Sequence, residues 1–527
     1  MSSANPGRHT VALVALISLG CGGSGPVTGS GGQSGATGGG GAVGSGGAGS
    51  GGQIGTGGGV ASGGGGAVGS GGAGSGGETG SGGETGGNTQ GGLTDISGKA
   101  MVSCNLTVLP TTGLSEFIST VGIVEFSAEL PGATAAFVQF GKTSDYTMEA
   151  PVDLTAANYR TLLLGMTADA EYHYRIGLVT ATEACVSPDQ TIVTGPMPAG
   201  NLANAMVTPG PSSAPIEPGF IVNASYNDTW IYIMNAAGEI VWYFDSVTFS
   251  PNPDAPLTNW TRARMSWDGK YMWLRDGNPG AADGEGKIGK IAMDGSSSTI
   301  VDVPTSHHDL SVLPDGSIVY IKKNPGGSCD AIYRHAGDGM NFDGDEMVFD
   351  IATAFSGGAC HTNSIHYHVA DGSYTVSELD HNAYLKVSAE GELEWVLGGD
   401  SSDFSGDGAS WEREHGHHLL AEDRLLFFNN GPMNSASPAR EVQLDLTAMT
   451  ATFGFEYSST DCNGNCLSVF MGDVQRLPGG NTLVTYSSIG IAHEVDPDGV
   501  MIRSIDMPAG TAGYSEHRPT LYGPPPR

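Results

Sequence analysis

Histidine is the residue type whose spacing in this chain most clearly indicates chemistry. Three groups of histidines follow one another along the sequence: His307 with His308, then His361, and then His415, His417 and His418. Near neutral pH an imidazole can act as a nucleophile, an acid, a base or a metal ligand. Subtraction gives 53 residues from His308 to His361 and 56 from His361 to His417. Such distant groups act together only if a repeating fold brings them to one place.

A repeating pattern of apolar strand, turn and second apolar strand surrounds these groups. The units start at Gly219, Thr261, His307, His361, His417 and Met471, so the steps are 42, 46, 54, 56 and 54 residues. This period allows four short strands per unit, and six units predict a six-bladed β-propeller. An array of sandwiches is the alternative. In a propeller the first strand of each blade lines the central channel, where residues of different units meet.

The stretch from residue 361 to residue 379 is the clearest of these sheet units. HTNSIHYH and SYTVSEL alternate apolar and polar residues on either side of an Asp-Gly turn at 371–372, which is a strong hairpin signal. Strict alternation places His366 and His368 on the face opposite to His361. The alternation predicts that His366 and His368 take the smallest part in any site.

The first 97 residues predict export rather than a fold. Residues 1–21 contain a short apolar run and the segment ISLGC, which resembles a bacterial lipobox with Cys21 as the lipid anchor. Residues 22–97 are almost wholly Gly, Ser, Ala and Thr, and such a segment predicts a disordered tether. We expect an exported lipoprotein, bound through its lipid to the outer membrane, at the periplasmic face or the cell surface.

Residues 98–197 predict a small β-sandwich, and residues 198–527 carry the propeller pattern. The segment EYHYRIGLV places Tyr172, Tyr174 and Ile176 on one face, and the segment around it resembles the end of a fibronectin type III domain. The whole chain is therefore predicted to be all-β.

Six cysteines remain when Cys21 is set aside. Export to an oxidising compartment favours their pairing in disulfides. The domain boundaries favour three disulfide pairs: Cys104 with Cys185, Cys329 with Cys360, and Cys462 with Cys466. A zinc site at CNGNC is less favoured, because no second cysteine pair faces it.

The charge of the chain excludes one class of partner. Its 55 acidic and 22 basic residues give a net charge of −33, which argues against a nucleic-acid surface. This negative charge repels an anionic substrate, so such a substrate requires a local cationic pocket.

Four motifs together resemble the bacterial arylsulfotransferase family over about residues 200–525. They are HHDLSVLPDG, HTNSI with its later GELEWVLGG, the segment ending in FFNNG, and GDVQRLPGGNTLV. The resemblance implies a six-bladed propeller that moves a sulfuryl group from a phenolic sulfate ester to a phenol. It implies no nucleotide donor and no cofactor, and one histidine becomes transiently sulfated.

The resemblance also implies roles for single residues. His417 matches the nucleophile, with His418 as the neighbouring alternative, while His361 and Asn363 match the H-x-N motif and His308 matches the first channel histidine.

One departure from the family pattern concerns charge. Leu379 lies near the position where the family commonly has an arginine, so a fixed cation is missing. The candidates to replace or support it are His307, His381, Arg264 and Arg518.

Two other functions stay open at this point. The missing arginine and the tether also fit a surface propeller that binds ligands or has a structural role without turnover. Neutral histidines can hold a metal ion, so a metal-binding propeller is the second alternative. The family resemblance explains the same histidines without a metal.

Overall fold

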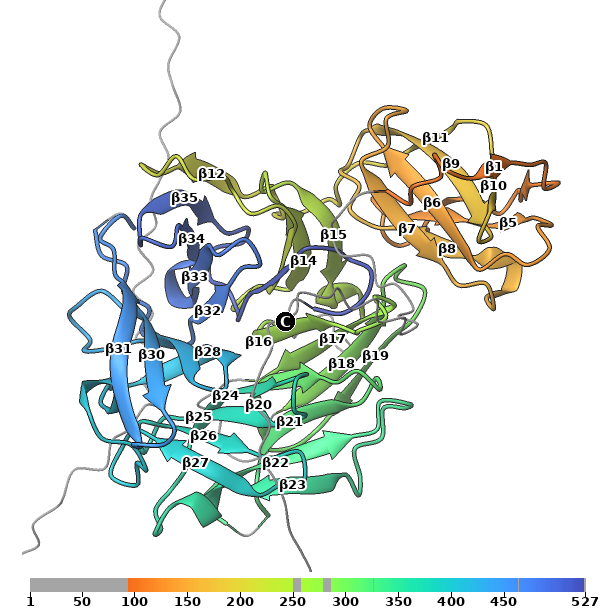
Figure 1. The fold of residues 1–527 in the computed structure, drawn as a ribbon. Coiled ribbons are helices and arrows are strands. Elements are labelled where there is room, and N and C mark those ends of the chain that lie inside the picture. Colours follow the sequence, from red (N-terminus) through yellow and green to blue (C-terminus); the bar gives the residue numbers. More distant parts are fainter. Residues whose placement is uncertain (1–92, 250–256, 278–285, 326, 463, 526–527) are drawn as a thin grey trace, which may run out of the picture. The chain divides into compact units, whose positions relative to one another are not determined.

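The computed structural model describes residues 93–249, 257–277, 286–325, 327–462 and 464–525, and Figure 1 shows its ribbon. The described chain is all-β, as predicted. Its helices are five short 3-10 turns: η1 (Ala157–Tyr159), η2 (Ser246–Phe249), η3 (Ile351–Ala354), η4 (Asp407–Ala409) and η5 (Ser487–Ile489). No helix in these residues is long and apolar enough to cross a bilayer. The predicted signal segment, Cys21 and residues 22–92 of the linker lie outside the described residues.

Three small sheets form the first part of the described chain. The largest has the order β1 (Ala100–Met101), β10 (Glu183–Val186), β9 (Glu171–Val179), β6 (Ala135–Gly141) and β7 (Met148–Val152), with β11 (Gln190–Val193) also paired to β9. The others are β3 (Gly113–Leu114), β4 (Gly122–Val124) and β8 (Thr161–Leu163), and β2 (Thr107–Val108) with β5 (Phe126–Ser127). Tyr172, Tyr174 and Ile176 of β9 are buried in one apolar core, which confirms the predicted alternation.

Six sheets of four or five strands follow in the residues that the structure describes. Three are β36-β13-β14-β15 (Glu516–Arg518, Phe220–Ala224, Trp230–Asn235, Ile240–Asp245), β16-β17-β18-β19 (Trp260–Met265, Tyr271–Asp276, Lys287–Ala292, Ser298–Asp302) and β20-β21-β22-β23 (Ser306–Val312, Ile318–Lys323, Asp330–His335, Glu346–Asp350). The others are β24-β25-β26-β27 (Thr362–Tyr367, Tyr374–Glu378, Ala383–Val387, Leu393–Leu397), β28-β29-β30-β31 (Glu414–Ala421, Arg424–Asn429, Ala439–Asp445, Thr450–Tyr457) and β32-β33-β34-β35-β12 (Asp473–Arg476, Thr482–Tyr486, Ile491–Val495, Met501–Asp506, Met206–Pro209).

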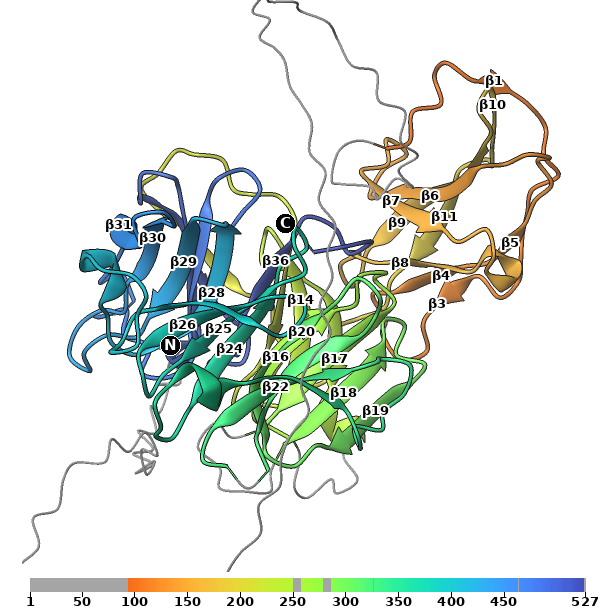
Figure 2. The same cartoon turned by 60° about the horizontal axis from the view of Figure 1, so that its bottom comes forward.

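The first strands of these sheets lie next to one another. Figures 1 and 2 show β16, β20, β24 and β28 in succession, and each contacts the next, as β28 contacts β32. Strands from the two ends of this part complete two sheets, because β36 pairs with β13 and β12 pairs with β35. The predicted Asp-Gly turn joins β24 to β25, and Gly372 has the left-handed φ of 74° that this turn needs.

Two predicted unit starts are wrong. The strand after Gly219 is the second of its sheet, because the C-terminal strand β36 occupies the innermost place. His417 is not at a strand start either, since β28 begins at Glu414. The first error comes from reading sequence order as spatial order, and the second comes from placing the start of one strand three residues too late.

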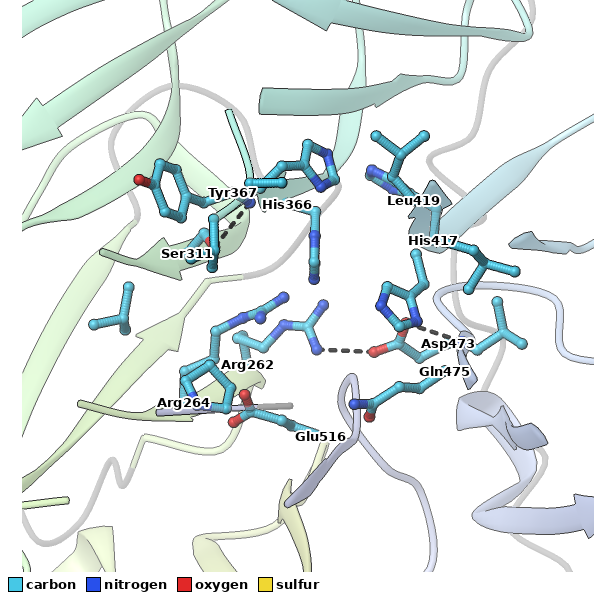
Figure 3. A pocket seen from close by; sticks show the side chains of 18 of the residues that line it. Arg262, Arg264, Ser311, His366, Tyr367, His417, Leu419, Asp473, Gln475 and Glu516 are labelled. Carbon is cyan, nitrogen blue, oxygen red and sulfur yellow. Dashed lines mark hydrogen bonds and ion pairs between the residues drawn. The ribbon is translucent and has the colours of Figure 1, made fainter. Parts of the chain in front are cut away.

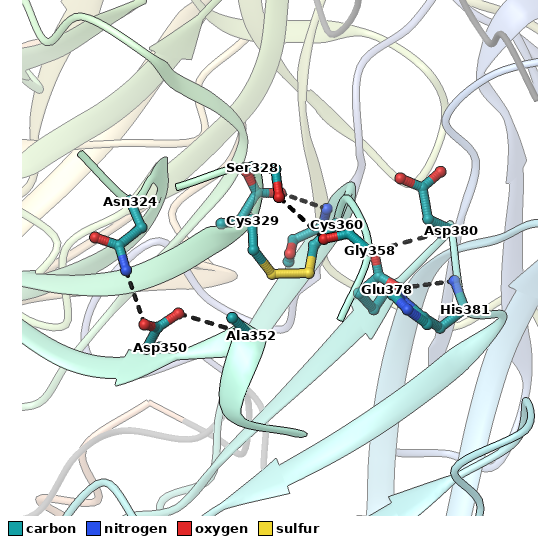
Figure 4. The surroundings of a disulfide bond; sticks show 12 residues. Asn324, Ser328, Cys329, Asp350, Ala352, Gly358, Cys360, Glu378, Asp380 and His381 are labelled. Atoms are coloured by element: carbon teal, nitrogen blue, oxygen red, sulfur yellow. Dashed lines mark hydrogen bonds and ion pairs between the residues drawn. A yellow bond between two sulfur atoms is a disulfide. The ribbon is translucent and has the colours of Figure 1, made fainter. Parts of the chain in front are cut away.

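The three predicted disulfide pairs are present: Cys104–Cys185, Cys329–Cys360 and Cys462–Cys466. Figure 4 shows the second, which ties the residue before β22 to the segment that leads into β24. It therefore fixes Asp330 and His361, which directly follow its two cysteines.

An ionic triad joins three of the inner strands. Arg262 of β16 donates from Nε and Nη2 to the two carboxylate oxygens of Asp309 in β20, at 2.6 and 3.0 Å. Its Nη1 donates to Asp473 of β32 at 2.8 Å. The Arg262 guanidinium lies 4.4 Å from the Tyr514 ring centre, and the Tyr514 hydroxyl donates to the Asn363 carbonyl at 2.8 Å. All three charged side chains are buried, so the pairing is essential.

Replacing Arg262 with Met is expected to leave two buried carboxylates without their cation. The free energy of unfolding should fall by about 3 to 5 kcal/mol, measured by urea denaturation. The control is Arg440→Met, which breaks a partly exposed pair with Glu456 and should cost less than about 1 kcal/mol. Equal losses in the two variants would contradict a special role for the triad.

Candidate functional site

Eight histidines on β20, β24 and β28, or directly beside them, form two clusters. The start cluster, at the beginnings of the strands, contains His307, His308, His361 and His415. The end cluster, further along the same strands, contains His366, His368, His417 and His418. Along β20, Asp309 of the ionic triad follows His308 directly, so the triad separates the two clusters along the strands.

The start cluster is a chain of close ring contacts. The Nδ1 atoms of His307 and His308 are 2.8 Å apart, and the Nε2 atoms of His308 and His361 are 3.4 Å apart. The ring centroids of His308 and His415 lie 6.2 Å apart. The structure therefore brings together His308 and His361, as predicted, and adds His307 and His415.

β-Bulges re-aim the side chains at these strand starts. Register shifts lie between Ser306 and Leu310, between Thr362 and Ser364, and between Glu414 and His417. Extra residues in one strand turn side chains away from strict alternation. The three bulges explain why period-two counting could not assign the clusters.

Asp330 anchors one end of the start cluster. Its Oδ1 lies 3.0 Å from His307 Nε2, and its Oδ2 accepts from the backbone N–H of Thr362 at 2.7 Å. Asp330 is buried and directly follows Cys329. The Cys329–Cys360 disulfide therefore holds this carboxylate beside the histidines.

Asn430 fixes the tautomer of His415. The Asn430 amide group donates to the carbonyls of Ser468 and Met471, both at 2.8 Å, which identifies its oxygen as the atom 2.5 Å from His415 Nδ1. An amide oxygen only accepts, so His415 Nδ1 carries the proton. A neutral His415 then has its lone pair on Nε2, which is the nucleophilic form.

Burial keeps His308, His361 and His415 neutral. Burial together with nearby histidines lowers the pKa of His361 to about 4 and that of His415 to about 3. Burial also lowers the pKa of His308 well below its usual value, with contributions from its neighbours and from Arg275. His307 and His361 are only partly buried, so the cluster reaches the protein surface.

His417 lies in the end cluster, apart from its predicted partners. Ser364 Oγ is 2.8 Å from its Nδ1 and Thr375 Oγ1 is 2.7 Å from its Nε2, so hydroxyls occupy both ring nitrogens. Its described ring neighbours are His366 and Tyr384, not His308 or His361. His366 and His368 do point away from His361, as predicted, but they accompany His417. His418 accepts from the backbone N–H of Arg476 at 3.2 Å.

Asn363 and His381 stand beside the start cluster. Asn363 donates from Nδ2 to the Glu414 carbonyl at 2.6 Å. His381 lies 2.7 Å from one carboxylate oxygen of Glu378, and the bond to this carboxylate raises its pKa. The other Glu378 oxygen accepts from the His361 backbone N–H at 2.5 Å.

The predicted cations lie elsewhere. The backbone N–H of Leu379 donates to the His361 carbonyl at 2.9 Å, so Leu379 and the acidic Glu378 end β25 beside the cluster. Arg264 lines a cavity with His417, and Arg518 pairs with Glu516 at 3.7 Å. Neither is in contact with the start cluster among the described residues.

Arg275 is a cation that sequence reasoning missed. It is fully buried, and burial lowers its pKa to about 10. Its Nη1 donates to the Lys287 carbonyl at 3.2 Å, while Nε and Nη2 have no partner in the described part of the chain. A signal for His415 was also missed: the turn of its hairpin starts at Glu422, seven positions after it, much as the turn at Pro314 starts six positions after His308.

Metal-ligand geometry is found only at other places among the described residues. The two groups with suitably close atoms are Cys462, Cys466 and His493, and Cys360, Glu378 and His381. The cysteines of both are in disulfides, so neither offers a thiolate. The start cluster does not meet this geometry.

Part of the chain that carries these histidines matches a known protein family. Residues 347–506 match the family model described as arylsulfotransferase (ASST). The predicted resemblance to the arylsulfotransferase family is thereby confirmed. The match includes His361, His415 and His417 but begins after Arg275 and His308. No curated protein matches the chain.

Solved structures give more distant likenesses. Virginiamycin B lyase from Staphylococcus aureus is 14% identical, with a TM-score of 0.36, over 57% of this chain and 87% of that one. A streptogramin B lyase is 13% identical, with a TM-score of 0.36, over 61% and 100%. A putative 6-phosphogluconolactonase from Bacteroides uniformis is 10% identical, with a TM-score of 0.34, over 57% and 99%. Likenesses this distant carry no argument about activity.

Acid is expected to destabilise the fold through the buried histidines. The unfolded chain binds protons near pH 6.5, whereas His361, His415 and His417 bind them only near pH 3 to 4. Each such histidine removes up to about 1.4 kcal/mol per pH unit below 6.5. We expect the free energy of unfolding to fall by at least about 3 kcal/mol between pH 7.5 and pH 5, measured by urea denaturation.

The variant His517→Gln tests how much one buried histidine contributes to the change of the free energy of unfolding with pH. Burial lowers the pKa of His517 to about 4, so its removal should reduce the proton uptake on unfolding at pH 5 by about one. Burial raises the pKa of Glu414 well above the usual value and also raises the pKa of Glu217, Asp380 and Asp473, so these carboxyls oppose the histidines in part. A stability that stays flat or rises toward pH 5 would contradict neutral buried histidines.

Proposed function

We propose that this protein is an arylsulfotransferase that moves a sulfuryl group from a phenolic sulfate ester to a phenol through a sulfohistidine, without a nucleotide donor. The arylsulfotransferase match over residues 347–506 supports sulfuryl transfer. The start cluster supports the histidine route. The observation that carries the proposal is that neutral imidazoles from successive inner strands meet within hydrogen-bond distance, with one tautomer fixed by Asn430.

We assign the nucleophile to His415 instead of the predicted His417. His415 has a proton on Nδ1 and a lone pair on Nε2, and it lies beside His308. His417 has hydroxyl partners on both nitrogens. An attacking nitrogen must present a free lone pair, so His415 is the better placed of the two.

The reaction has two balanced steps. His415 Nε2 forms a bond to sulfur while the bond from sulfur to the aryl oxygen breaks, and the leaving phenolate takes a proton. The oxygen of the acceptor phenol, which loses a proton, then attacks sulfur, and the bond from nitrogen to sulfur breaks. His415 returns to its neutral form, and one proton has been given and one recovered.

The start cluster offers a path for this proton. Asp330 accepts from His307 Nε2, which leaves His307 Nδ1 to accept from His308 Nδ1 in the neutral state. His308 Nε2 then faces His361 Nε2 as an acceptor. A proton taken up by His361 passes through His308 to His307, and the Asp330 carboxylate balances its charge.

Charge on the sulfuryl oxygens requires a donor in the transition state, because such transfers pass through a loose, charge-dispersed state. Arg275 supports this role, since its positive charge acts on His308 and two of its N–H groups have no partner in the described chain. Removing one such donor typically costs about 3 to 4 kcal/mol.

A second candidate function is ligand binding without turnover. It is favoured by the acidic Glu378 and the apolar Leu379 beside His361, where the family commonly places an arginine. This function leaves the start cluster as a recognition site for phenols or their sulfate esters.

The remaining predictions fit this proposal. The six sheets favour a six-bladed β-propeller, and the preceding sheets favour a fibronectin type III-like sandwich. Export as a lipoprotein through Cys21 would place the enzyme at the outer membrane, with small phenolic substrates and no nucleic acid among its partners.

Replacing His415 with Ala is expected to abolish transfer. With 4-nitrophenyl sulfate alone, the wild-type protein should release at most about one equivalent of nitrophenol, because the first step sulfates one histidine, and it should turn over repeatedly only when excess phenol is present. His415→Ala should lose at least about a thousandfold in kcat/KM, and His417→Ala should stay within about tenfold of wild type. Peptide mass mapping should find the sulfuryl group on His415. Loss of transfer in His417→Ala with none in His415→Ala would reverse the assignment, and an inactive wild type that still binds the ester would favour the second candidate.

Replacing Asp330 with Asn is expected to weaken the proton path while the fold is kept. We expect kcat to fall by about 10- to 100-fold with little change in KM, and the limbs of the pH profile of kcat to shift. Asp350→Asn is the matched control, because Asp350 caps η3 and bonds Asn324 without touching a histidine. An unchanged pH profile in Asp330→Asn would contradict a relay and leave Asp330 a purely structural role.

A further inference from the structure

A cavity at the ends of the inner strands is distinct from the start cluster. It has a volume of about 430 Å³, which lies within the usual range of small-ligand sites. Figure 3 shows Arg262, Arg264, His366 and His417 around one space, with Asp473 and Glu516 beneath them. The proposed transfer chemistry uses none of these residues.

Arg264 lines this cavity with N–H donors that lack an acceptor among the described residues. It is only 11% exposed, and its nearest carboxylate oxygen, Oδ2 of Asp309, lies 4.0 Å from Nη2, beyond hydrogen-bond distance. The Asp309 oxygens already accept from Arg262, and so does one Asp473 oxygen. Arg264 Nε is buried without a partner among the described residues. A buried guanidinium in this state calls for an acceptor from a ligand or from water.

Two histidines of the end cluster also have ring nitrogens that face the cavity without a described hydrogen-bond partner. His418 Nδ1 accepts from the Arg476 backbone, so a neutral His418 carries its proton on Nε2, a further donor. His366 is partly buried in the cavity wall, and its Nδ1 is buried without a partner in the described chain. His417 takes no part, because both its nitrogens are occupied. The cavity therefore offers donors at Arg264 Nε and His418 Nε2, beside one buried acceptor without a partner in the described chain, Glu516 Oε2.

Part of the cavity lining is apolar. Its side chains come from β16, β20 and β28 and the residues just beyond them: Met265, Trp267, Val312, Leu419 and Leu420. Such side chains hold a ring or a short hydrocarbon chain. Together with the N–H groups of Arg264 and His418 they match a molecule with an oxyanion at one end and an apolar body at the other.

The charges of the lining oppose an occupant with more than one negative charge. Its two arginines, Arg262 and Arg264, stand against Asp371, Glu422, Asp473 and Glu516, so the lining has no excess positive charge and an anion is favoured only by the local N–H groups of Arg264 and His418. A monoanion can exploit the directional N–H groups of Arg264, which match the paired oxygens of a carboxylate or sulfonate.

We infer that this cavity is a second binding site, for a small organic monoanion whose carboxylate, sulfonate or sulfate ester bonds to Arg264 and His418 and whose apolar body packs on Met265, Val312 and Leu419. The site does not depend on the proposed function, because it lies beyond the ionic triad from the start cluster. A sulfate ester substrate and an unrelated carboxylate share this chemistry, and the probes below separate them.

Isothermal titration calorimetry on the full chain tests the site with three probes: benzenesulfonate, benzoate and the neutral benzyl alcohol. Wild type should bind at least one of the two anions, and benzyl alcohol should bind at least about tenfold more weakly. Preference for benzenesulfonate points to sulfate esters, and preference for benzoate points to carboxylates. Arg264→Gln should weaken anion binding by at least about tenfold, whereas Arg440→Gln, a partly exposed control, should not change it.

Two further variants keep the result decisive. Leu419→Trp fills the cavity without touching a charge and should also block binding, even if Arg264→Gln alters the fold. His415→Ala should leave binding unchanged, which separates this site from the transfer site, whatever the outcome of the turnover assay. The inference is overturned if His415→Ala removes the binding, if both Arg264→Gln and Leu419→Trp bind as wild type does, or if no anion binds at about 10 mM.

Discussion

The buried ion pairs of Arg262 are the interaction on which the rest of this structure depends. One guanidinium holds Asp309 and Asp473, and through these residues it connects β16, β20 and β32. Asp309 also accepts from the backbone N–H of Ile365, which adds β24. Charges in a low-dielectric interior must be paired in good geometry, so the inner strands are held at a defined spacing. That spacing sets how closely the histidines before and after the triad can approach one another.

The close packing around the triad also explains the glycine at position 416. A Cβ there would come within 2.1 Å of Asp473 Oδ1, so only glycine allows the carboxylate to approach β28. This glycine separates His415 from His417. The two histidines therefore enter different clusters although they are two residues apart, and the chemistry proposed for one does not extend to the other.

The Cys329–Cys360 disulfide has a comparable role at the edge of the start cluster. Each cysteine directly precedes a residue of the proposed proton path, Asp330 in one sheet and His361 in the next. A covalent link between neighbouring sheets restricts their relative motion, and hydrogen bonds of 2.7 to 3.0 Å from Asp330 need that restriction. The position of this disulfide beside the start cluster, and not at the rim of a sheet, suits a role in positioning the site.

The sequence by itself determined the all-β class, the recurring strand units and the meeting of His308 with His361, because alternation, turn residues and repeat spacing are local or periodic signals. The domain boundaries favoured the three cysteine pairs without fixing them. Only the tertiary structure decided which histidine of the group at 415–418 joins them. Three β-bulges shift the register by extra residues, and a bulge has no signature in strict alternation. The places of Asp330, Arg275 and β36 likewise depend on contacts between residues far apart in sequence, which chain closure creates and local pattern does not encode.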